Sequence, residues 1–412
     1  MHSYDVVVMG AGAAGLFCAG VAGQLGLRVL VLDHSERVAE KIRISGGGRC
    51  NFTNRDVDPA APHKHFLGDN PHFCRSALSR YTPQDFIALV QRHGIAFHEK
   101  HKGQLFCDRS ADDLIQMLLA ECGAGALGGH VDRWQPCSVK NIGFSATSQR
   151  ETVTSSYQIE SDRGTVECAA VVVATGGLSI PKIGATDFGY RVARQFGLRL
   201  VETRPGLVPL TFDEQAWAPY AQLSGLSLPV RIETGTKKAR GEFLEDLLFT
   251  HRGLSGPAVL QISSYWREGD ALSLDLLPGQ DAGAMLRRSK VEAGRGQLAG
   301  ALARMLPDRL ARHLADLSGV TGPLAEVPGA TLDRVAAGLA DWRLVPVGSE
   351  GYRTAEVTLG GVDTEALDAR TMQARAVPGL YFVGEVVDIT GWLGGYNFQW
   401  AWSSGWAAGQ VA

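Results

Sequence analysis

Residues 4–15 read YDVVVMGAGAAG, a short apolar run that leads directly into three glycines, Gly10, Gly12 and Gly15. The apolar run predicts a buried strand, and the small residues after it predict a helix that continues to about Leu25. In such a unit the first glycine allows a tight turn, the second lets the backbone approach a pyrophosphate, and the third lets helix and strand pack closely. The stretch therefore predicts a Rossmann-like unit that holds a dinucleotide at the N-terminus of the helix.

The next predicted strand, residues 28–32, ends at Asp33. An acidic residue about 20 positions beyond the glycines accepts hydrogen bonds from ribose hydroxyls, and its charge repels the 2′-phosphate of NADP. Asp33 therefore favours FAD or NAD. A glycine fingerprint alone also occurs in ordinary strand-helix turns, but here the strand, the helix and the acidic residue stand in the expected order.

Residues 45–54, SGGGRCNFTN, form a second glycine-rich stretch. Three successive glycines permit close backbone approach to a ligand, and Arg49 adds a fixed positive charge. The alternative is a flexible linker. Asn, Arg and Thr interleaved with the glycines offer more polar groups than a linker needs, so we interpret the stretch as a binding loop.

The chain has 412 residues, which predicts two or three domains, and its net charge of −3 argues against a generally basic nucleic-acid coat while leaving room for a local patch. Seven cysteines form no Cys-x-x-Cys pair and no spacing suited to zinc, which predicts reduced cytosolic thiols and no metal site. A basic secretory start and a run of about 18 apolar residues are both missing, which predicts a cytoplasmic protein without a membrane span.

Further elements are expected after the binding loop. The patterns predict helices at 83–93 and 110–122, a strand pair within 97–106, a hairpin within 157–167 and a buried strand at 170–174. This buried strand ends in Thr175-Gly176-Gly177, which places small residues at the carboxyl edge of a parallel sheet, where dinucleotides bind.

The middle of the chain differs in character and predicts an inserted domain, with strands at 230–234 and 271–277 and a helical pattern across 298–317. The predicted division is 1–190 for the first part of the dinucleotide-binding domain, 191–345 for the insert and 346–412 for the second part. Within the insert, His251 and Arg252 precede a glycine-rich turn. They either face a substrate or tie two domains together, and the sequence leaves both readings open.

The last segment of the chain is predicted to return to the dinucleotide-binding domain and to add a strand to its sheet. Residues 379–383 predict a strand that Gly384 and Glu385 close, an ending that can present a carboxylate to the ribityl chain of a flavin. The stretch 391–399 predicts the start of a final helix, whose first amides can stabilise the reduced flavin near its N1–C2=O edge. Four of the eight tryptophans lie in this region, and we interpret most of them as core packing rather than a platform for bases.

Five blocks, Ile44–Asn54, Ala174–Ile180, Leu248–Ser263, Ala355–Asp363 and Gly379–Gly405, together resemble the bacterial YhiN-like flavoproteins, also called BaiN/RdsA-like. The resemblance spans nearly the whole chain and is closest to the RdsA type. It implies an α/β fold: a Rossmann-like FAD-binding domain of the two-dinucleotide-binding-domain type, with an inserted β-barrel and helical domain. The FAD contacts that it implies are Gly10, Gly12, Ala14, Gly15, Asp33, Lys41, Gly47, Gly48, Arg49, Asn51, Thr175, Gly176, Gly384, Glu385, Tyr396 and Asn397. In one departure, Pro136 stands where relatives use a backbone amide against adenine, and proline has no N–H to donate.

The resemblance implies hydride transfer through flavin N5, with reactions that differ among family members: reduction of a uridine in 23S ribosomal RNA, reduction of enones, or oxidation of small amines. It favours the RNA reaction, with NADPH or NADH as a transient electron donor and no stable protein partner. A flavin-holding RNA or ribosome assembly factor without turnover is the non-enzymatic alternative. The candidate proton donors are Cys50, His251 and Tyr396, and the candidate basic rim for RNA consists of Arg43, Lys237, Lys238 and Arg240.

Overall fold

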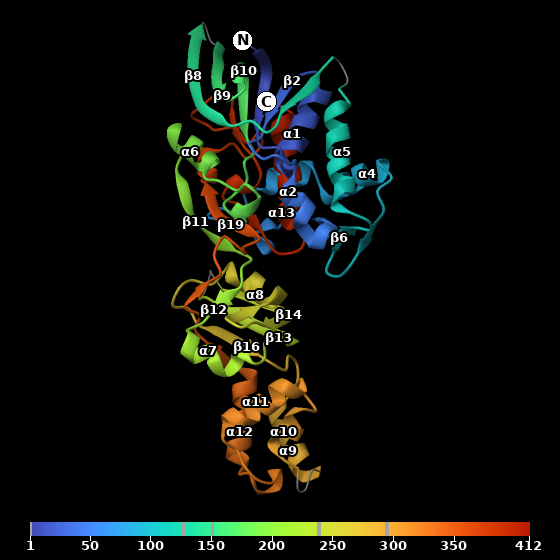
Figure 1. Cartoon of the computed structure of the whole chain (residues 1–412), viewed down its shortest axis with the longest axis vertical. Coiled ribbons are helices and arrows are strands. Elements are labelled where there is room, and N and C mark those ends of the chain that lie inside the picture. The colour runs from blue at the N-terminus through green and yellow to red at the C-terminus, as the bar shows by residue number, and fades with distance from the viewer. Residues whose placement is uncertain (1, 126–127, 150–151, 237–239, 293–295) are drawn as a thin grey trace. The chain divides into compact units, whose positions relative to one another are not determined.

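The computed structural model describes residues 2–125, 128–149, 152–236, 240–292 and 296–412. Contacts divide the chain into two compact units (Figure 1). The discontinuous unit comprises Met1–Arg204 with Val357–Ala412, and the inserted unit comprises Pro205–Glu356. The boundaries predicted from the sequence, 190/191 and 345/346, lie earlier in the chain. The difference arises because β11 (Leu200–Gly206) pairs with β19 (Val357–Val362), which ties the segment after residue 190 to the discontinuous unit.

A parallel sheet forms the centre of the discontinuous unit, in the order β7-β2-β1-β10, with β20 beside the second half of β10. Val6, Val7 and Val8 are fully buried, as expected for the middle strand of a parallel sheet. The arrangement confirms the predicted strands 4–9 and 28–32 and the Rossmann-like fold. The bounds are β1 His2–Met9, β2 Arg28–Leu32, β7 His130–Trp134, β10 Gly164–Val173 and β20 Leu380–Phe382.

The predicted hairpin and the predicted buried strand share one long strand, β10. Its first half pairs antiparallel with β9 (Thr152–Ser161), which pairs with β8 (Val139–Gln149). On its other edge β10 pairs in parallel with β1 from Val166 to Val173, and Val171–Val173 also pair in parallel with β20. The turn at residues 175–177 follows β10 and therefore lies at the carboxyl edge of the parallel sheet, between the ends of β1 and β20.

The other elements of the discontinuous unit surround this sheet (Figure 1). They confirm the helices predicted at 83–93 and 110–122 and the strand pair predicted within 97–106. The helices are α1 Ala13–Gln24, α2 Glu40–Ile44, α3 Arg75–Arg80, α4 Pro83–Arg92, α5 Ala111–Gly123, α6 Phe188–Gln195 and α13 Tyr396–Gly409. The further strands are β3 Asn51–Asn54, β5 Phe97–Glu99 and β6 Gln104–Cys107, which form one sheet, and the pair β4 Phe66–Leu67 and β21 Thr390–Gly391.

Helix α13 packs directly on α1. A Cβ on Gly405 would lie 2.6 Å from the carbonyl oxygen of Ala14, so the two helices approach as closely as glycine allows. Trp400 and Trp402 are at most 1% exposed, and Trp402 stacks on Phe86 with ring centroids 4.4 Å apart. Core packing is therefore confirmed for these two tryptophans.

The inserted unit contains an antiparallel sheet in the order β17-β16-β13-β14-β15-β12-β18. Among the described residues no pairing joins β17 to β18, so closure into the expected barrel stays a prediction. The strands predicted at 230–234 and 271–277 are confirmed as β13 and β16. The strand bounds are β12 Leu210–Thr211, β13 Ser227–Thr234, β14 Gly241–Phe249, β15 Gly253–Ser255, β16 Leu272–Asp275, β17 Trp342–Leu344 and β18 Gly348–Ser349.

The helical pattern predicted across 298–317 is two helices rather than one. Pro307 stands just before the second of them, where a proline cannot donate the backbone hydrogen bond that a continuous helix needs. The helices of the inserted unit are α7 Glu214–Ala221, α8 Gly256–Ser263, α9 Ala282–Glu292, α10 Leu298–Leu302, α11 Asp308–Ser318 and α12 Gly329–Ala340.

No helix in the described ranges is long and apolar enough to cross a membrane. The same ranges hold no group of three or more His, Cys, Asp or Glu side chains that could bind a metal ion. All seven cysteines are free and buried.

Candidate functional site

The three glycines after β1 have different environments. Gly10 adopts a φ of +113°, and a Cβ there would lie 2.4 Å from the carbonyl oxygen of Ala174. A Cβ on Gly15 would lie 1.9 Å from the carbonyl oxygen of Gly10. A Cβ on Gly12, in contrast, would meet no heavy atom of the described residues within 4 Å. Backbone packing therefore requires Gly10 and Gly15, whereas the space over Gly12 is open to a ligand.

Asp33 follows β2, and its carboxylate holds the turn together. Oδ2 accepts a hydrogen bond from the backbone N–H of Ala11 at 2.6 Å, and Oδ1 accepts one from Ser35 at 2.7 Å. The side chain keeps 15% exposure. Because each carboxylate oxygen can accept more than one hydrogen bond, the exposed edge of Asp33 can still receive ribose hydroxyls.

The turn after β10 contains a buried polar atom without a partner. Oγ1 of Thr175 is buried and makes no hydrogen bond within the described part of the chain. The next residue, Gly176, has a φ of +72°, and a Cβ there would meet no described heavy atom within 4 Å. Because an unpaired buried hydroxyl is unfavourable, Thr175 is suited to a hydrogen bond with a bound ligand.

A polar network joins four segments of the discontinuous unit, which contribute Lys41, Ser179, Thr358 and Glu385. Nζ of Lys41 lies 2.5 Å from Oε2 of Glu385 and 2.6 Å from Oγ of Ser179. Oε1 of Glu385 accepts hydrogen bonds from the Ser179 hydroxyl at 3.0 Å and from the backbone N–H of Thr358 at 2.9 Å. Glu385 is only 17% exposed, so these partners hold its carboxylate in one place.

Gly384, the residue before Glu385, packs tightly against α1 and α13. It has a φ of +73°, and a Cβ there would lie 2.9 Å from the Cβ of Ala14. Its N–H donates to Oγ of Ser404 at 3.0 Å, and its carbonyl accepts a hydrogen bond from Nε1 of Trp400 at 3.0 Å. Helix α13 therefore fixes the backbone that carries Glu385.

The loop predicted to bind a ligand has a backbone that only glycine adopts readily. Gly46, Gly47 and Gly48 have φ values of +56°, +67° and +84°. A Cβ on Gly46 would lie 2.9 Å from the backbone nitrogen of Asn51, whereas one on Gly47 would meet no described heavy atom within 4 Å. Arg49 follows with an exposed side chain. The backbone at Gly47 is therefore open to a ligand, and the positively charged side chain of Arg49 follows two residues later.

Two asparagines hold the loop that precedes α13. Oδ1 of Asn397 accepts from the N–H of Gly391 at 2.8 Å, and its Nδ2 donates to the carbonyl of the same residue at 2.8 Å. In the amide orientation that satisfies its neighbours, Asn51 accepts from the N–H of Gly395 at 3.3 Å and donates to the carbonyl of Leu105 at 3.2 Å. Both side chains are engaged with the protein, so a cofactor contact at these residues would use their backbone.

Tyr396, the first residue of α13, belongs to an aromatic cluster. Its ring stacks on His65 with centroids 4.8 Å apart, and His65 meets Trp392 edge-on at 5.0 Å. Nδ1 of His65 is buried and has no hydrogen-bond partner among the residues that the structure describes. Burial lowers the pKa of His65, so the imidazole stays neutral at physiological pH.

The three candidate proton donors differ in access. Cys50 is fully buried, and burial raises the pKa of its thiol. Tyr396 is 5% exposed, and burial raises the pKa of its phenol. Both groups therefore keep their proton at neutral pH. His251 is exposed in the turn between β14 and β15, which belongs to the inserted unit rather than to the unit of the other two.

Three members of this site were not singled out from the sequence: Ser179, Thr358 and His65. Ser179 stands two residues after Gly177, which is the only local sign of its role. Thr358 lies in a strand with no polar pattern, and His65 lies among other polar residues. Each of the three joins the site through contacts with residues that are far away in the sequence, so no local pattern indicates its role.

The residues of the discontinuous unit fit a flavin dinucleotide. The open space over Gly12, the unpaired Thr175 hydroxyl and the exposed backbone at Gly47 are what such a ligand would cover. The unit is a Rossmann-type FAD-binding flavoprotein domain. Residues 4–411 match the HI0933-like protein Rossmann domain, and the chain belongs to that family.

Comparison with known proteins gives relatives over the full length. The chain is 48% identical over 416 residues to the ribosomal RNA dihydrouridine synthase of Escherichia coli (strain K12), with 100% of this chain and 98% of that protein covered. It is 26% identical over 423 residues to the 3-dehydro-bile acid delta(4,6)-reductase of Clostridium scindens, with 98% of each covered. A solved 3-ketosteroid-delta4-(5alpha)-dehydrogenase from Rhodococcus jostii RHA1 has a similar fold, with a TM-score of 0.51 and 16% identity over 99% of this chain and 96% of that one.

Proposed function

We propose that this chain is an FAD-dependent reductase that converts a uridine of 23S ribosomal RNA to dihydrouridine. The observation that carries the proposal is the 48% identity, over the whole chain, to the Escherichia coli protein named for that reaction. The open backbone at Gly12 and the network around Glu385 support the cofactor part.

The proposed reaction saturates the C5–C6 double bond of uracil, which is conjugated to the C4 carbonyl. When bound, FAD supplies a hydride equivalent through flavin N5. The protein must then provide a proton and polarise the carbonyl. We propose NADPH or NADH as the electron donor, docking transiently, because no second glycine fingerprint follows a predicted strand in the sequence.

Tyr396 is our choice for the proton donor. Its phenol keeps its proton because burial raises its pKa, and stacking on His65 holds the ring in one orientation. Cys50 also keeps its proton, but its side chain is fully buried and is out of reach of a substrate at the surface. His251 remains a candidate from the inserted unit.

A second candidate function is reduction of a small enone. It is favoured by the 26% identity, again over nearly the whole chain, to a protein named as a bile acid reductase. The two functions share their chemistry, because uracil and a steroid enone each present a carbon–carbon double bond conjugated to a carbonyl.

The deciding experiment incubates the purified, FAD-loaded protein with 23S RNA from a strain that lacks dihydrouridine in this RNA. NADPH, NADH and dithionite serve as alternative reductants under anaerobic conditions. We expect one uridine to gain two hydrogen atoms, read as a mass increase of one RNA fragment. Unchanged RNA with every reductant contradicts the proposal, and turnover of a steroid enone in the same assay favours the second candidate.

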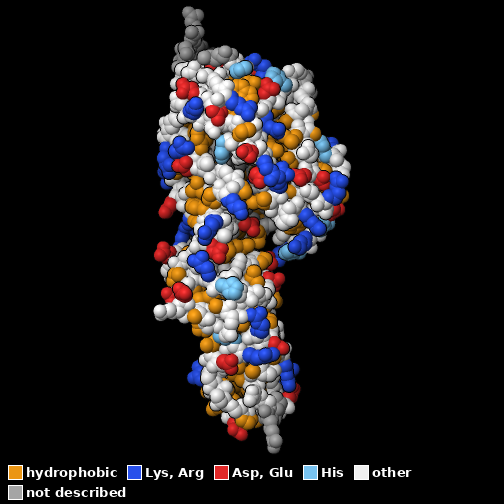
Figure 2. Space-filling model, in the orientation of Figure 1, with side chains coloured by type: hydrophobic (Ala, Val, Ile, Leu, Met, Phe, Trp, Pro, Cys, Tyr) orange, Lys and Arg blue, Asp and Glu red, His pale blue; other side chains and the backbone are white. Residues whose placement is uncertain are grey.

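The basic rim expected from the sequence is only partly available. Arg43 and Arg240 each form ion pairs with carboxylates. Lys237 and Lys238 lie outside the described residues. On the face drawn in Figure 2, Lys and Arg side chains are mixed with Asp and Glu rather than gathered in one field.

The tip of the β5–β6 hairpin is the surface that we propose for RNA phosphates. It carries Lys100, His101 and Lys102, all exposed. Nδ2 of Asn54 donates to the carbonyls of Lys102 at 3.0 Å and Gly394 at 2.8 Å. This amide joins the basic tip to the loop before α13, so RNA bound at the tip would lie against the same structural block as Tyr396.

Replacing both Lys100 and Lys102 by Gln is expected to weaken RNA binding and to leave the FAD content unchanged. The slope of log affinity against log salt should fall by about 0.7 to 0.9 for each lysine that contacts a phosphate. Filter binding at several salt concentrations measures it. The control replaces Lys140 and Arg163, two exposed cations of the β8–β10 region, by Gln. An equal loss in both double variants would assign the effect to net charge alone.

A further inference from the structure

The turn between β14 and β15, Thr250–Gly253, carries two basic side chains that the described fold does not use. His251 and Arg252 are exposed, and neither side chain forms an ion pair or a hydrogen bond with a described residue. Arg252 is therefore available to an anion from outside the chain. Several arginines of the same unit, in contrast, have carboxylate partners: Arg231, Arg240, Arg287, Arg304, Arg312 and Arg343.

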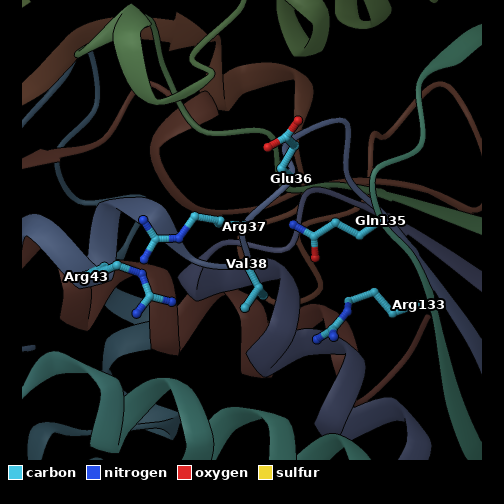
Figure 3. Close-up of a pocket in the computed structure, with 6 residues that line it drawn as sticks. All are labelled: Glu36, Arg37, Val38, Arg43, Arg133 and Gln135. Carbon is cyan, nitrogen blue, oxygen red and sulfur yellow. The ribbon is translucent and has the colours of Figure 1, made fainter.

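The arginines around the pocket drawn in Figure 3 are also balanced by the chain itself. Arg37 and Arg43 line this pocket of the discontinuous unit. Their Nε atoms lie 3.1 Å and 3.2 Å from the same oxygen of Glu40. The positive charge of Arg252 has no such carboxylate among the described residues, which favours a role in binding over a role in holding the fold together.

The backbone of the Thr250–Gly253 turn is held in one conformation. The N–H of Thr250 donates to the carbonyl of Gly253 at 2.8 Å, and Oγ1 of Thr250 accepts from the N–H of Gly253 at 3.1 Å. From outside the turn, Nε1 of Trp217 donates to the carbonyl of Thr250 at 3.1 Å. A fixed backbone reduces the entropy that the exposed side chains lose when they bind a ligand.

The half-exposed ring of Phe212 lies next to Arg252. Thr211 of β12 pairs with Gly253 of β15, and the N–H of Phe212 donates to the carbonyl of Arg252 at 3.1 Å. Phe212 and Arg252 are therefore the next pair in the same antiparallel register, and such pairs carry their side chains on one face. Trp217 covers one face of the Phe212 ring, with centroids 4.6 Å apart, and the ring stays half-exposed.

Two exposed valines between β17 and β18 extend this surface. Val345 and Val347 are 55% and 57% exposed. The N–H of Val347 donates to the carbonyl of Thr211 at 2.9 Å, so Val347 lies at the same end of β12 as Phe212. The carboxylate of Asp213, the next residue, accepts hydrogen bonds from two backbone N–H groups of α7 at 3.0 Å. The surface is therefore apolar, with an unpaired guanidinium beside it.

The size and charge of this surface fit one nucleotide of a single strand. A stable protein partner typically covers about 800 Å² of each surface with 20 to 30 residues, far more than one ring and two valines provide. Single-stranded RNA, in contrast, is bound by stacking unpaired bases on aromatic rings, while arginines contact the neighbouring phosphates. A guanidinium without a carboxylate partner matches the charge and the geometry of a phosphate.

We propose that Phe212, Arg252 and Val347 bind single-stranded RNA, with an unpaired base stacked on Phe212 beside Val347 and a neighbouring phosphate on Arg252. The inference rests on the RNA part of the proposed function. It gives the inserted unit an RNA contact of its own, in addition to the phosphates expected at the tip of the β5–β6 hairpin. In this assignment the turn that carries His251 and Arg252 faces a substrate rather than tying two domains together.

The test measures binding of the FAD-loaded protein to 23S RNA from a strain that lacks dihydrouridine in this RNA, by filter binding at several salt concentrations. For Arg252→Gln we expect weaker binding, and a slope of log affinity against log salt that is smaller by about 0.7. Phe212→Leu keeps an apolar side chain but loses the stacking surface. It should weaken binding about 10-fold without changing the slope.

A third variant changes only an exposed position. Val347→Glu places a negative charge beside Arg252 and should weaken RNA binding while leaving the FAD content unchanged. The matched controls should bind RNA like wild-type. They are exposed changes elsewhere on the chain: Val291→Glu on α9, Phe144→Leu on β8 and Arg267→Gln after α8.

RNA affinities equal to those of the matched controls overturn the inference. If Phe212→Leu loses its FAD or its fold, the exposed changes Arg252→Gln and Val347→Glu decide the question alone. If wild-type neither binds nor reduces 23S RNA, the proposed function fails together with the inference. If wild-type reduces the RNA and the variants bind it like their controls, the proposed function stands and only this contact is wrong.

Discussion

The Gly12→Val variant is expected to fold normally and to lose its flavin. Gly12 is the N-cap of α1 with φ −87° and ψ −166°, an extended conformation open to any residue. Since a Cβ there meets no described heavy atom within 4 Å, the free energy of unfolding of the apoprotein should stay within about 0.5 kcal/mol of wild-type. The valine side chain fills the space in which a pyrophosphate approaches the backbone amides. Loss of those charge-assisted hydrogen bonds should lower FAD affinity about 100-fold.

The matched variant is Gly15→Ala, which changes the same turn in the opposite way. Its Cβ would lie 1.9 Å from the carbonyl oxygen of Gly10, so the backbone itself must move. We expect a loss of about 3 kcal/mol in the free energy of unfolding. Denaturant unfolding and FAD titration of both apoproteins separate the two roles. A Gly12→Val protein that keeps FAD, or unfolds as easily as Gly15→Ala, would show that the roles are assigned wrongly.

Asp388→Asn is expected to stabilise the protein, and only above acidic pH. Asp388 is 2% exposed, and its Oδ2 accepts a hydrogen bond from the N–H of Asp69 at 2.8 Å. Burial raises the pKa of Asp388 to about 6, and the nearby carboxylates of Asp69 and Asp363 act in the same direction. An asparagine keeps an oxygen acceptor for Asp69 without the buried charge.

The direction of this pH dependence follows from the linkage between protonation and folding. An aspartate whose pKa is higher in the folded state than in the unfolded state loses stability as pH rises from the unfolded pKa to the folded one. For Asp388 this window runs from 3.8 to about 6. At 1.36 kcal/mol per pKa unit, a shift of about two units corresponds to about 3 kcal/mol. The gain from Asp388→Asn should thus be absent below pH 4 and complete above pH 6.

Denaturant unfolding at pH 4 and pH 8 measures this difference. The control is Glu160→Gln, which removes an exposed carboxylate on β9 and should have little effect at either pH. An equal gain from Asp388→Asn at both pH values would mean that packing, rather than the buried charge, is responsible.

Much of the fold could be predicted because its signals are local. The strand expected at 28–32 is found at Arg28–Leu32, since a run of β-branched and leucine residues ends at a polar residue. The roles of Gly10, Gly12 and Gly15 also lie within a single turn, and the structure gives each the environment that its spacing implies.

The polar partners of the site could not be predicted in the same way. Ser179 and Glu385 are 206 positions apart, and no local pattern relates them. The unpaired Nδ1 of His65 depends on Trp392 and Tyr396, which arrive from the far end of the chain. Sequence periodicity reports which face of an element is buried, but it does not report which distant side chain lies opposite.

The unit that holds these groups is built from the two ends of the chain. Lys41 meets a carboxylate 344 residues later, and Nε1 of Trp402 donates to the carbonyl of Phe52 at 2.8 Å. Lys41 and Phe52 therefore meet partners that are translated 344 and 350 residues later. A nascent copy of this protein cannot complete this unit before residues 385–402 have been synthesised, so these contacts are missing from every shorter nascent chain.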